Sequence, residues 1–187
     1  MSLKQFKAES ELGGSLTVAG NVQKLEVKDG DWSGNVNVGG ELQQVKVGRH
    51  FRGQLDVAGK VQKLDIKDGD FRGDLSAGGL EKVKVDGSLV DAQLLVAGVL
   101  EKLDIGGNML RSELSGGSFE DISVDGRYTD SDIIAALLDT VEVGMQMSSS
   151  TGAHEICASA DDLFELEVNG VTYNIADAVG SDVGGVR

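Results

Sequence analysis

Proline is absent from this chain, and cysteine occurs once among its 187 residues. Without proline, every residue keeps the backbone N–H that central strands of a sheet need for their ladder hydrogen bonds. The single Cys157 excludes an internal disulfide, although it does not distinguish a reducing from an oxidising compartment. We recognise neither a signal peptide nor an apolar run long enough to span a bilayer.

Basic and aromatic residues are also scarce. Lys and Arg number 17 against 31 Asp and Glu, so the formal net charge is −14, and aromatic residues make up 4% of the chain. A surface this acidic repels nucleic acids and acidic membranes, and we expect neither as a partner. Basic partners and divalent cations are compatible with it.

Internal repetition is the strongest signal in the sequence. Residues 20–34 and 59–73 are identical at ten of fifteen positions, and a shorter motif, apolar-x-x-apolar-x-apolar, recurs every 19 or 20 residues. An apolar-x-small pair precedes each copy and a bulky residue follows it. The seven copies are Val22/Leu25/Val27, Leu42/Val45/Val47, Val61/Leu64/Ile66, Leu80/Val83/Val85, Leu100/Leu103/Ile105, Phe119/Ile122/Val124 and Leu138/Val141/Val143.

The repeat predicts stacked β-strands. Alternation with a period of two is typical of strands with one buried face, and the Gly and Asp-Gly residues between them are typical of turns. One unit of about 20 residues cannot bury its apolar face alone, but stacked units can. We therefore predict an all-β fold, a parallel β-helix (β-solenoid) of about eight coils. Its inward columns run through Leu55, Val61, Leu64, Ile66 and Phe71.

The period also bears on handedness and on domain organisation. A left-handed hexapeptide helix needs about 18 residues per coil, so a right-handed coil is favoured. We expect one solenoid domain over residues 1–175, with regular coils at 13–147 and a last coil at 156–173. In that last coil, Val171 or Tyr173 takes the bulky position. Residues 176–187 form a cover over the coil or a tail.

An inserted corner loop at residues 148–155 interrupts the repeat before the last coil. Insertions in solenoids project from one face and often carry recognition. Ser149, Ser150, Thr151 and His154 are therefore candidate binding residues, and a tolerated surface loop is the alternative.

Acidic residues in the turns are candidate calcium ligands. Asp29 and Asp31 flank a glycine, and Asp68 and Asp70 do so in an identical turn, where their oxygens suit calcium. The two turns are two coils apart, about 10 Å, so one ion cannot bridge them. Arg49 lies between them as an expected counter-charge. Ordinary turn carboxylates without a cofactor are the alternative.

Outward charges alternate along the stack. The residue between the last two inward positions is in turn Glu26, Lys46, Asp65, Lys84 and Asp104. We expect these side chains to lie next to one another as a solvated ladder, because opposite charges stabilise neighbouring strands.

No catalytic constellation is visible, and we predict that the chain is not an enzyme. His50 lies in a corner without an evident carboxylate partner, and Cys157 has only His154 near it in sequence. Trp32, Phe51 and Phe71 share one column. They form either an inward stack or an exposed platform for carbohydrate.

The first residues match the second half of a coil, with Leu3, Phe6 and Ala8 facing inward. An open strand edge invites pairing. We therefore expect these residues to contact a second copy end to end, as a head-to-head dimer, or to contact adjoining segments of a longer chain.

The LxVxGxVxxLxV coils with Asp-Gly corners resemble the β-solenoid repeats of large bacterial surface proteins. Over roughly residues 3–143 they also resemble the bactofilin core, a cytoskeletal β-helix that polymerises end to end. The resemblance implies a rigid structural spacer or assembly module at a bacterial cell surface, with the cytoplasm as the alternative. A calcium-binding, polysaccharide-binding or polysaccharide-processing β-helix is the alternative function.

Overall fold

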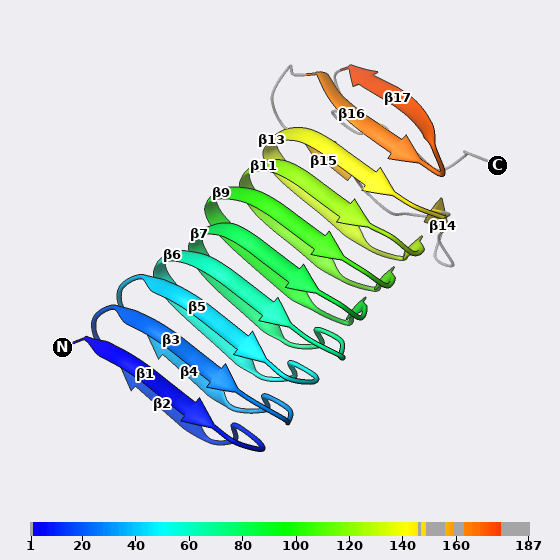
Figure 1. The fold of residues 1–187 in the computed structure, drawn as a ribbon. Coiled ribbons are helices and arrows are strands. Elements are labelled where there is room, and N and C mark those ends of the chain that lie inside the picture. Colours follow the sequence, from blue (N-terminus) through cyan, green and yellow to red (C-terminus); the bar gives the residue numbers. More distant parts are fainter. Residues whose placement is uncertain (1, 146, 149–155, 159–162, 177–187) are drawn as a thin grey trace.

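The computed structural model describes residues 2–145, 147–148, 156–158 and 163–176. All regular elements in this part of the chain are strands, and they stack coil upon coil into a β-solenoid of about seven turns (Figure 1). The predicted all-β solenoid is confirmed, and the right-handed sense of its coil stays a prediction.

Each coil contributes strands to a long parallel sheet. The first coils use separate strands, whereas later coils use single long strands that bend between two columns and span both. The separate strands are β1 (Leu3–Ala8), β2 (Ser15–Val18), β3 (Val22–Val27), β4 (Asn35–Val38) and β5 (Leu42–Val47). The long strands are β6 (Gln54–Ile66), β7 (Asp74–Val85), β9 (Gln93–Ile105), β11 (Glu113–Val124) and β13 (Asp132–Val143).

The long parallel sheet forms two sides of each coil, and a second sheet forms the third side. Its strands are β8 (Leu89–Val90), β10 (Met109–Leu110), β12 (Tyr128–Thr129) and β14 (Met147–Ser148). Isolated parallel bridges extend this column from Leu89 back to Leu12. The register shifts at the bend of the long strands, for example between Ala77 and Leu80. Differences in coil length are absorbed there as well as in the corners.

The predicted inward columns form the core. Val45, Leu64 and Val83 lie in register on successive coils, and each is fully buried. Leu55, Val61, Ile66 and Phe71 are likewise fully buried. Burial of each such side chain contributes about 1.5–3 kcal/mol, and the columns repeat that contribution in every coil.

Trp32, Phe51 and Phe71 form an inward stack. Their ring centroids lie 5.2 Å and 4.6 Å apart, and all three rings are fully buried. The Trp32 indole donates its N–H to the carbonyl of Gly34 at 2.8 Å, which satisfies its one polar atom. These rings are therefore part of the core and offer no exposed platform to a carbohydrate.

The last coil departs from the prediction. β15 (Ile156–Ala158) and β16 (Leu163–Val168) continue the parallel stack on β13. β17 (Val171–Ala176) then returns antiparallel to β16, with Tyr173 opposite Leu166. The prediction that Val171 or Tyr173 continues the bulky column is wrong. Asn169 and Gly170 both have positive φ, the geometry of a tight hairpin turn that reverses the chain.

Among the described residues, no helix has the length and apolar character to cross a bilayer.

Candidate functional site

The predicted calcium ligands lie in two corners of the solenoid. Asp29 and Asp68 are exposed, whereas Asp31 and Asp70 are partly buried against the next coil. The Asp31 Oδ1 accepts the backbone N–H of His50 at 3.2 Å, and the Asp70 Oδ1 accepts that of Ser88 at 2.9 Å. Two of the four carboxylates therefore cap the backbone of a neighbouring coil.

These contacts belong to a column that runs through successive corners. In each corner one side chain accepts the backbone N–H of the residue stacked on it. The His50 Nδ1 accepts the N–H of Asp70 at 3.0 Å. The column continues with the N–H of Asn108 on the Ser88 Oγ at 3.0 Å and the N–H of Arg127 on the Asn108 Oδ1 at 2.8 Å. We call this set, Asp31, His50, Asp70, Ser88 and Asn108, the corner column.

Arginines neutralise the two acids of the corner column. The Arg72 guanidinium lies 2.8 Å from the Asp70 carboxylate, and the Arg52 Nε lies 3.6 Å from that of Asp31. Partial burial by itself raises the pKa of Asp70. The Ser88 N–H and the Arg72 guanidinium outweigh it and hold that pKa below its usual range. Arg49, the expected counter-charge, is exposed and makes no ion pair with any described residue. Arg52 lies closer to Asp31, and Arg72 lies closer to Asp70.

A calcium site would need several oxygen ligands around one point. Within the described ranges, no group of three or more His, Cys, Asp or Glu side chains is placed to hold a metal ion. The calcium ligands Asp29, Asp31, Asp68 and Asp70 stay a prediction that titration must test.

The predicted charge ladder lies on the outward face of the long parallel sheet, across β3, β5, β6, β7 and β9. Glu26, Lys46, Asp65, Lys84 and Asp104 are Cα partners on successive coils, as the sequence predicted, but Asp65 is buried and not solvated. The ion pairs run mainly along each strand, for example Lys24 with Glu26 at 2.9 Å and Lys63 with Asp65 at 3.6 Å.

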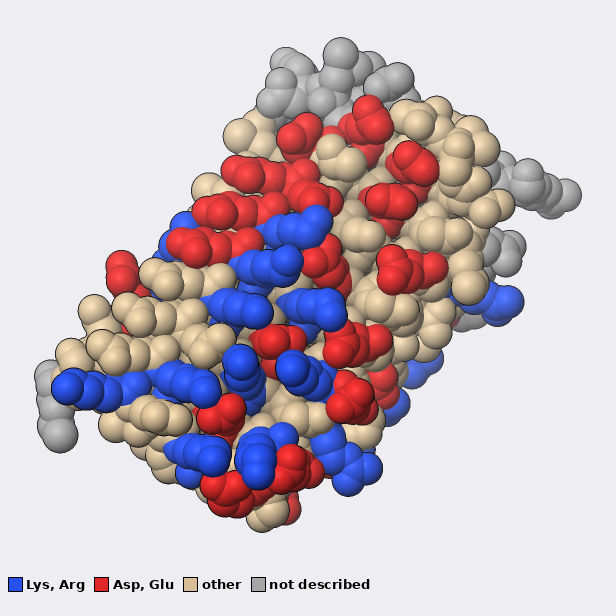
Figure 2. Space-filling view, in the orientation of Figure 1, with Lys and Arg blue, Asp and Glu red and all other residues tan. Residues whose placement is uncertain are grey.

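The alternation ends beyond Asp104. The next Cα partners are Ser123, Glu142 and Glu167, so no base follows on this column. Acidic side chains accordingly gather at the C-terminal end of this face, while lysines and arginines lie toward its N-terminal and middle parts (Figure 2). The face is therefore electrically polarised along the solenoid.

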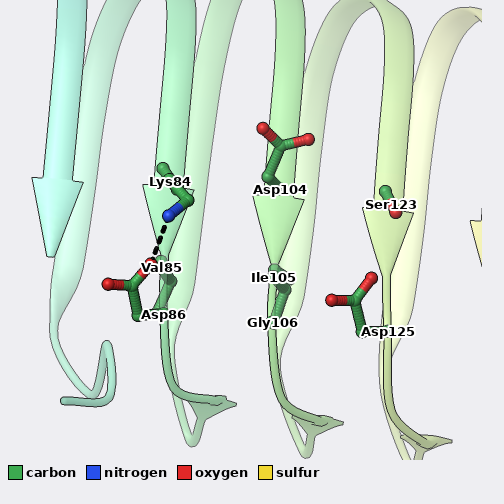
Figure 3. Close-up of a pocket in the computed structure, with 8 residues that line it drawn as sticks. All are labelled: Lys84, Val85, Asp86, Asp104, Ile105, Gly106, Ser123 and Asp125. Carbon is green, nitrogen blue, oxygen red and sulfur yellow. Dashed lines mark hydrogen bonds and ion pairs between the residues drawn. The ribbon is translucent and has the colours of Figure 1, made fainter. Parts of the chain in front are cut away.

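A hollow of about 380 Å³ opens on this face. Its lining residues are Lys84, Val85, Asp86, Asp104, Ile105, Gly106, Ser123 and Asp125 (Figure 3). Lys84 pairs with Asp86 at 2.5 Å, and Asp104 lies 3.2 Å from Lys102. Three of the four charged side chains around the hollow, Lys84, Asp86 and Asp104, are therefore already compensated within the protein.

The N-terminal end carries the predicted assembly residues. Among the described strands β1 has one neighbour, β3, and its other edge is unpaired. Leu3, Phe6 and Ala8 face inward and are only half-buried against the core. Beside them, a hollow of about 370 Å³ is lined by Ser2, Leu3, Leu16, Thr17, Val18 and Ala19. These three residues face the core as the repeat implies, and their role in assembly stays a prediction.

Other sequence candidates fall elsewhere. Ser149, Ser150, Thr151 and His154 lie outside the described residues. The backbone of Cys157 pairs with Ile134 on β15 and β13.

A group of exposed apolar residues on β9 and β13 was not anticipated. It leaves a signal in the sequence, because the runs at 94–96 and 133–138 place Leu, Ile or Ala where the alternation requires a polar residue.

In comparisons with known proteins, no family model, no curated protein and no solved structure matched the chain. The likeness to bacterial surface repeats and to bactofilins therefore stays a resemblance of sequence pattern.

Proposed function

We propose that the chain is a non-enzymatic, rigid β-solenoid module that associates through its N-terminal end. The single observation that carries the proposal is the open edge of β1, where Leu3, Phe6 and Ala8 are half-buried beside an apolar hollow. Unpaired strand edges and exposed apolar ends favour association with another strand.

Stiffness is the property that such a module supplies. Parallel pairing continues from β1 through β13, and the buried columns run through the same coils without interruption. Bending the solenoid would separate ladder hydrogen bonds and core contacts on one side. The solenoid therefore resists bending and keeps its length along its axis. A spacer or assembly element needs this and no chemistry.

Two occupants of the β1 edge are compatible with the proposal. A second copy pairs there directly, and a longer chain places a further coil there. The expected head-to-head dimer brings Lys4 of two copies together, since Lys7 is already paired with Glu9 at 2.7 Å, whereas a head-to-tail contact brings Lys4 toward the acidic end that carries Glu165 and Glu167. Opposite charges therefore favour the head-to-tail form in low salt.

Sedimentation velocity across a concentration series tests the proposal. A dimer plateau indicates head-to-head pairing, and a continuing rise in mass indicates head-to-tail stacking. Phe6→Lys places a charge at the contact and is expected to leave a monomer. Gln43→Lys adds the same charge to the exposed face of β5 and serves as the matched control.

Circular dichroism and thermal unfolding of both variants separate lost association from lost folding, and Ala8→Lys provides a second variant at the same end. A parent protein that is strictly monomeric at high micromolar concentration would exclude self-association. It would leave the spacer with β1 covered by a longer chain.

The proposal also places the module on a bacterial cell surface, on the strength of the sequence resemblance, with the cytoplasm as the alternative. Proteolysis of intact cells that carry an epitope-tagged chain tests this. Loss of the tag without lysis supports the surface, and full protection supports the cytoplasm.

A further inference from the structure

Four large apolar side chains lie outward on the later coils. Leu95 is 52% exposed, Val99 40%, Ile134 37% and Leu137 42%. We call these four residues the apolar patch. Single exposed apolar residues are common on protein surfaces, but a contiguous group is typical of an interaction site.

The strand register brings the patch together. Leu95 and Ile134 are the Cα partners of Ser115 on the two sides of β11, and Val99 and Leu137 are those of Ser118. The apolar side chains thus line β9 and β13, about 10 Å apart at two strand spacings. Between them the outward positions of β11 carry only Ser115 and Ser118, and Gly117 adds no side chain there. Small residues on the middle strand leave room for side chains of a partner.

The fold does not require apolar residues at these positions. In the column that contains Leu95, the earlier coils carry Asn37, Asp56 and Ser76. Those coils have the same backbone pairing and the same buried columns. The apolar residues are therefore a feature of this surface alone and contribute little to the core.

Carboxylates border the patch. Glu101, Glu120 and Asp139 follow Val99, Ser118 and Leu137 at the next outward positions of β9, β11 and β13. Glu101 pairs with Lys60 at 2.8 Å. Glu120 and Asp139 make no ion pair with any residue of the described ranges, and neither does Glu113 at the opposite end of β11.

From this arrangement we propose that the apolar patch binds a basic, amphipathic segment of a partner protein. Apolar side chains of the segment lie between β9 and β13, and its Lys or Arg side chains reach Glu113, Glu120 and Asp139. A second copy of this chain is a poor occupant, because a two-fold contact would place these carboxylates against one another.

Fluorescence anisotropy with labelled synthetic peptides tests the proposal at low and at physiological salt. The probe is an amphipathic Leu/Lys peptide. A scrambled peptide of the same composition and an amphipathic Leu/Glu peptide are the comparison probes. We expect the Leu/Lys peptide to bind at least tenfold more tightly than either, and we expect added salt to weaken its binding.

Variants locate the binding surface. Leu137→Asp, and separately Glu120→Lys, should weaken binding of the Leu/Lys peptide at least tenfold. Asp56→Lys changes an acid of the Leu95 column on an earlier coil and should leave binding unchanged. Leu137 and Glu120 are both exposed, so thermal unfolding of the first two variants should match the parent.

Three outcomes overturn the proposal. Equal binding of the scrambled peptide would reveal a general attraction to an acidic protein. Parent-like binding by Leu137→Asp would exclude the patch. A change of sedimentation in Leu137→Asp would show that a second copy covers it. Phe6→Lys should not affect peptide binding, so this test is independent of association through β1.

Discussion

His50 offers a sharp test of how the coils are held in register. Its Nδ1 accepts the backbone N–H of Asp70 in the coil stacked on it, at 3.0 Å. His50→Ala removes the acceptor and leaves that N–H without its partner. His50→Asn supplies a side-chain oxygen instead, as Asn108 does for Arg127 in a later corner at 2.8 Å.

The magnitude follows from the burial of the site. An unsatisfied buried donor costs about 1–3 kcal/mol. The His50 side chain is 26% exposed, so water reaches part of the corner and we expect the lower part of this range. His50→Ala should lower the free energy of unfolding by about 1–2 kcal/mol. His50→Asn should stay within about 0.5 kcal/mol of the parent, the ordinary range of substitutions that break no specific contact.

Urea denaturation at pH 8, followed by circular dichroism, measures both changes. A shift of the midpoint at constant slope reports stability, whereas a changed slope indicates that the coils no longer unfold together. Arg49→Ala is the matched control, because Arg49 is the exposed neighbour of His50 and makes no ion pair with a described residue. Parent-like stability of His50→Ala, or an equal loss in His50→Asn, would refute the role of the hydrogen bond.

Three further predictions concern the core, a corner acid and a glycine. Leu64→Ala should cost about 2–5 kcal/mol in urea denaturation, because Leu64 is fully buried between register partners that cannot collapse into the space; a loss below about 1 kcal/mol would contradict its place in the core. The pKa of Asp70 is lowered in the folded state, so its stabilising contribution is complete above the ordinary aspartate pKa of about 3.9 and is lost as pH falls through the folded value. Asp70→Asn should flatten the acid limb of stability against pH, and Asp68→Asn, at an exposed position, should leave it unchanged. Gly30→Ala should abolish folding or strongly lower the melting temperature, because the added Cβ would overlap a carbonyl of the preceding coil. Gly13→Ala should melt like the parent, because its Cβ would have no atom nearer than 3.7 Å.

The sequence by itself determined the core of this protein. Inward residues such as Val45, Leu64 and Val83 recur at constant spacing, and a strand has a side-chain period of two, so one register buries every column at once. The alternation of charge from Glu26 to Asp104 follows from the same register, since outward residues stack whenever inward residues do.

The reversal of the chain after β16 was also readable in the sequence. Asn169-Gly170 is a strong local signal for a hairpin. One more coil would place Val171 or Tyr173 in the bulky column, whereas the hairpin places both on β17, antiparallel to β16.

Tertiary structure alone decided what the polar corners and the outward apolar residues do. The corner column joins Asp31 to His50, 19 residues on, and Asp70 to Ser88, 18 residues on. The acceptors are carboxylate, imidazole, hydroxyl and amide groups, so no single residue type marks the whole column, although Asp recurs at Asp31 and Asp70. Their common property is a position above a backbone N–H, which exists only once the coils are stacked. The apolar patch likewise needs the parallel register of β9, β11 and β13, because only that register places Leu95 beside Ile134 across Ser115.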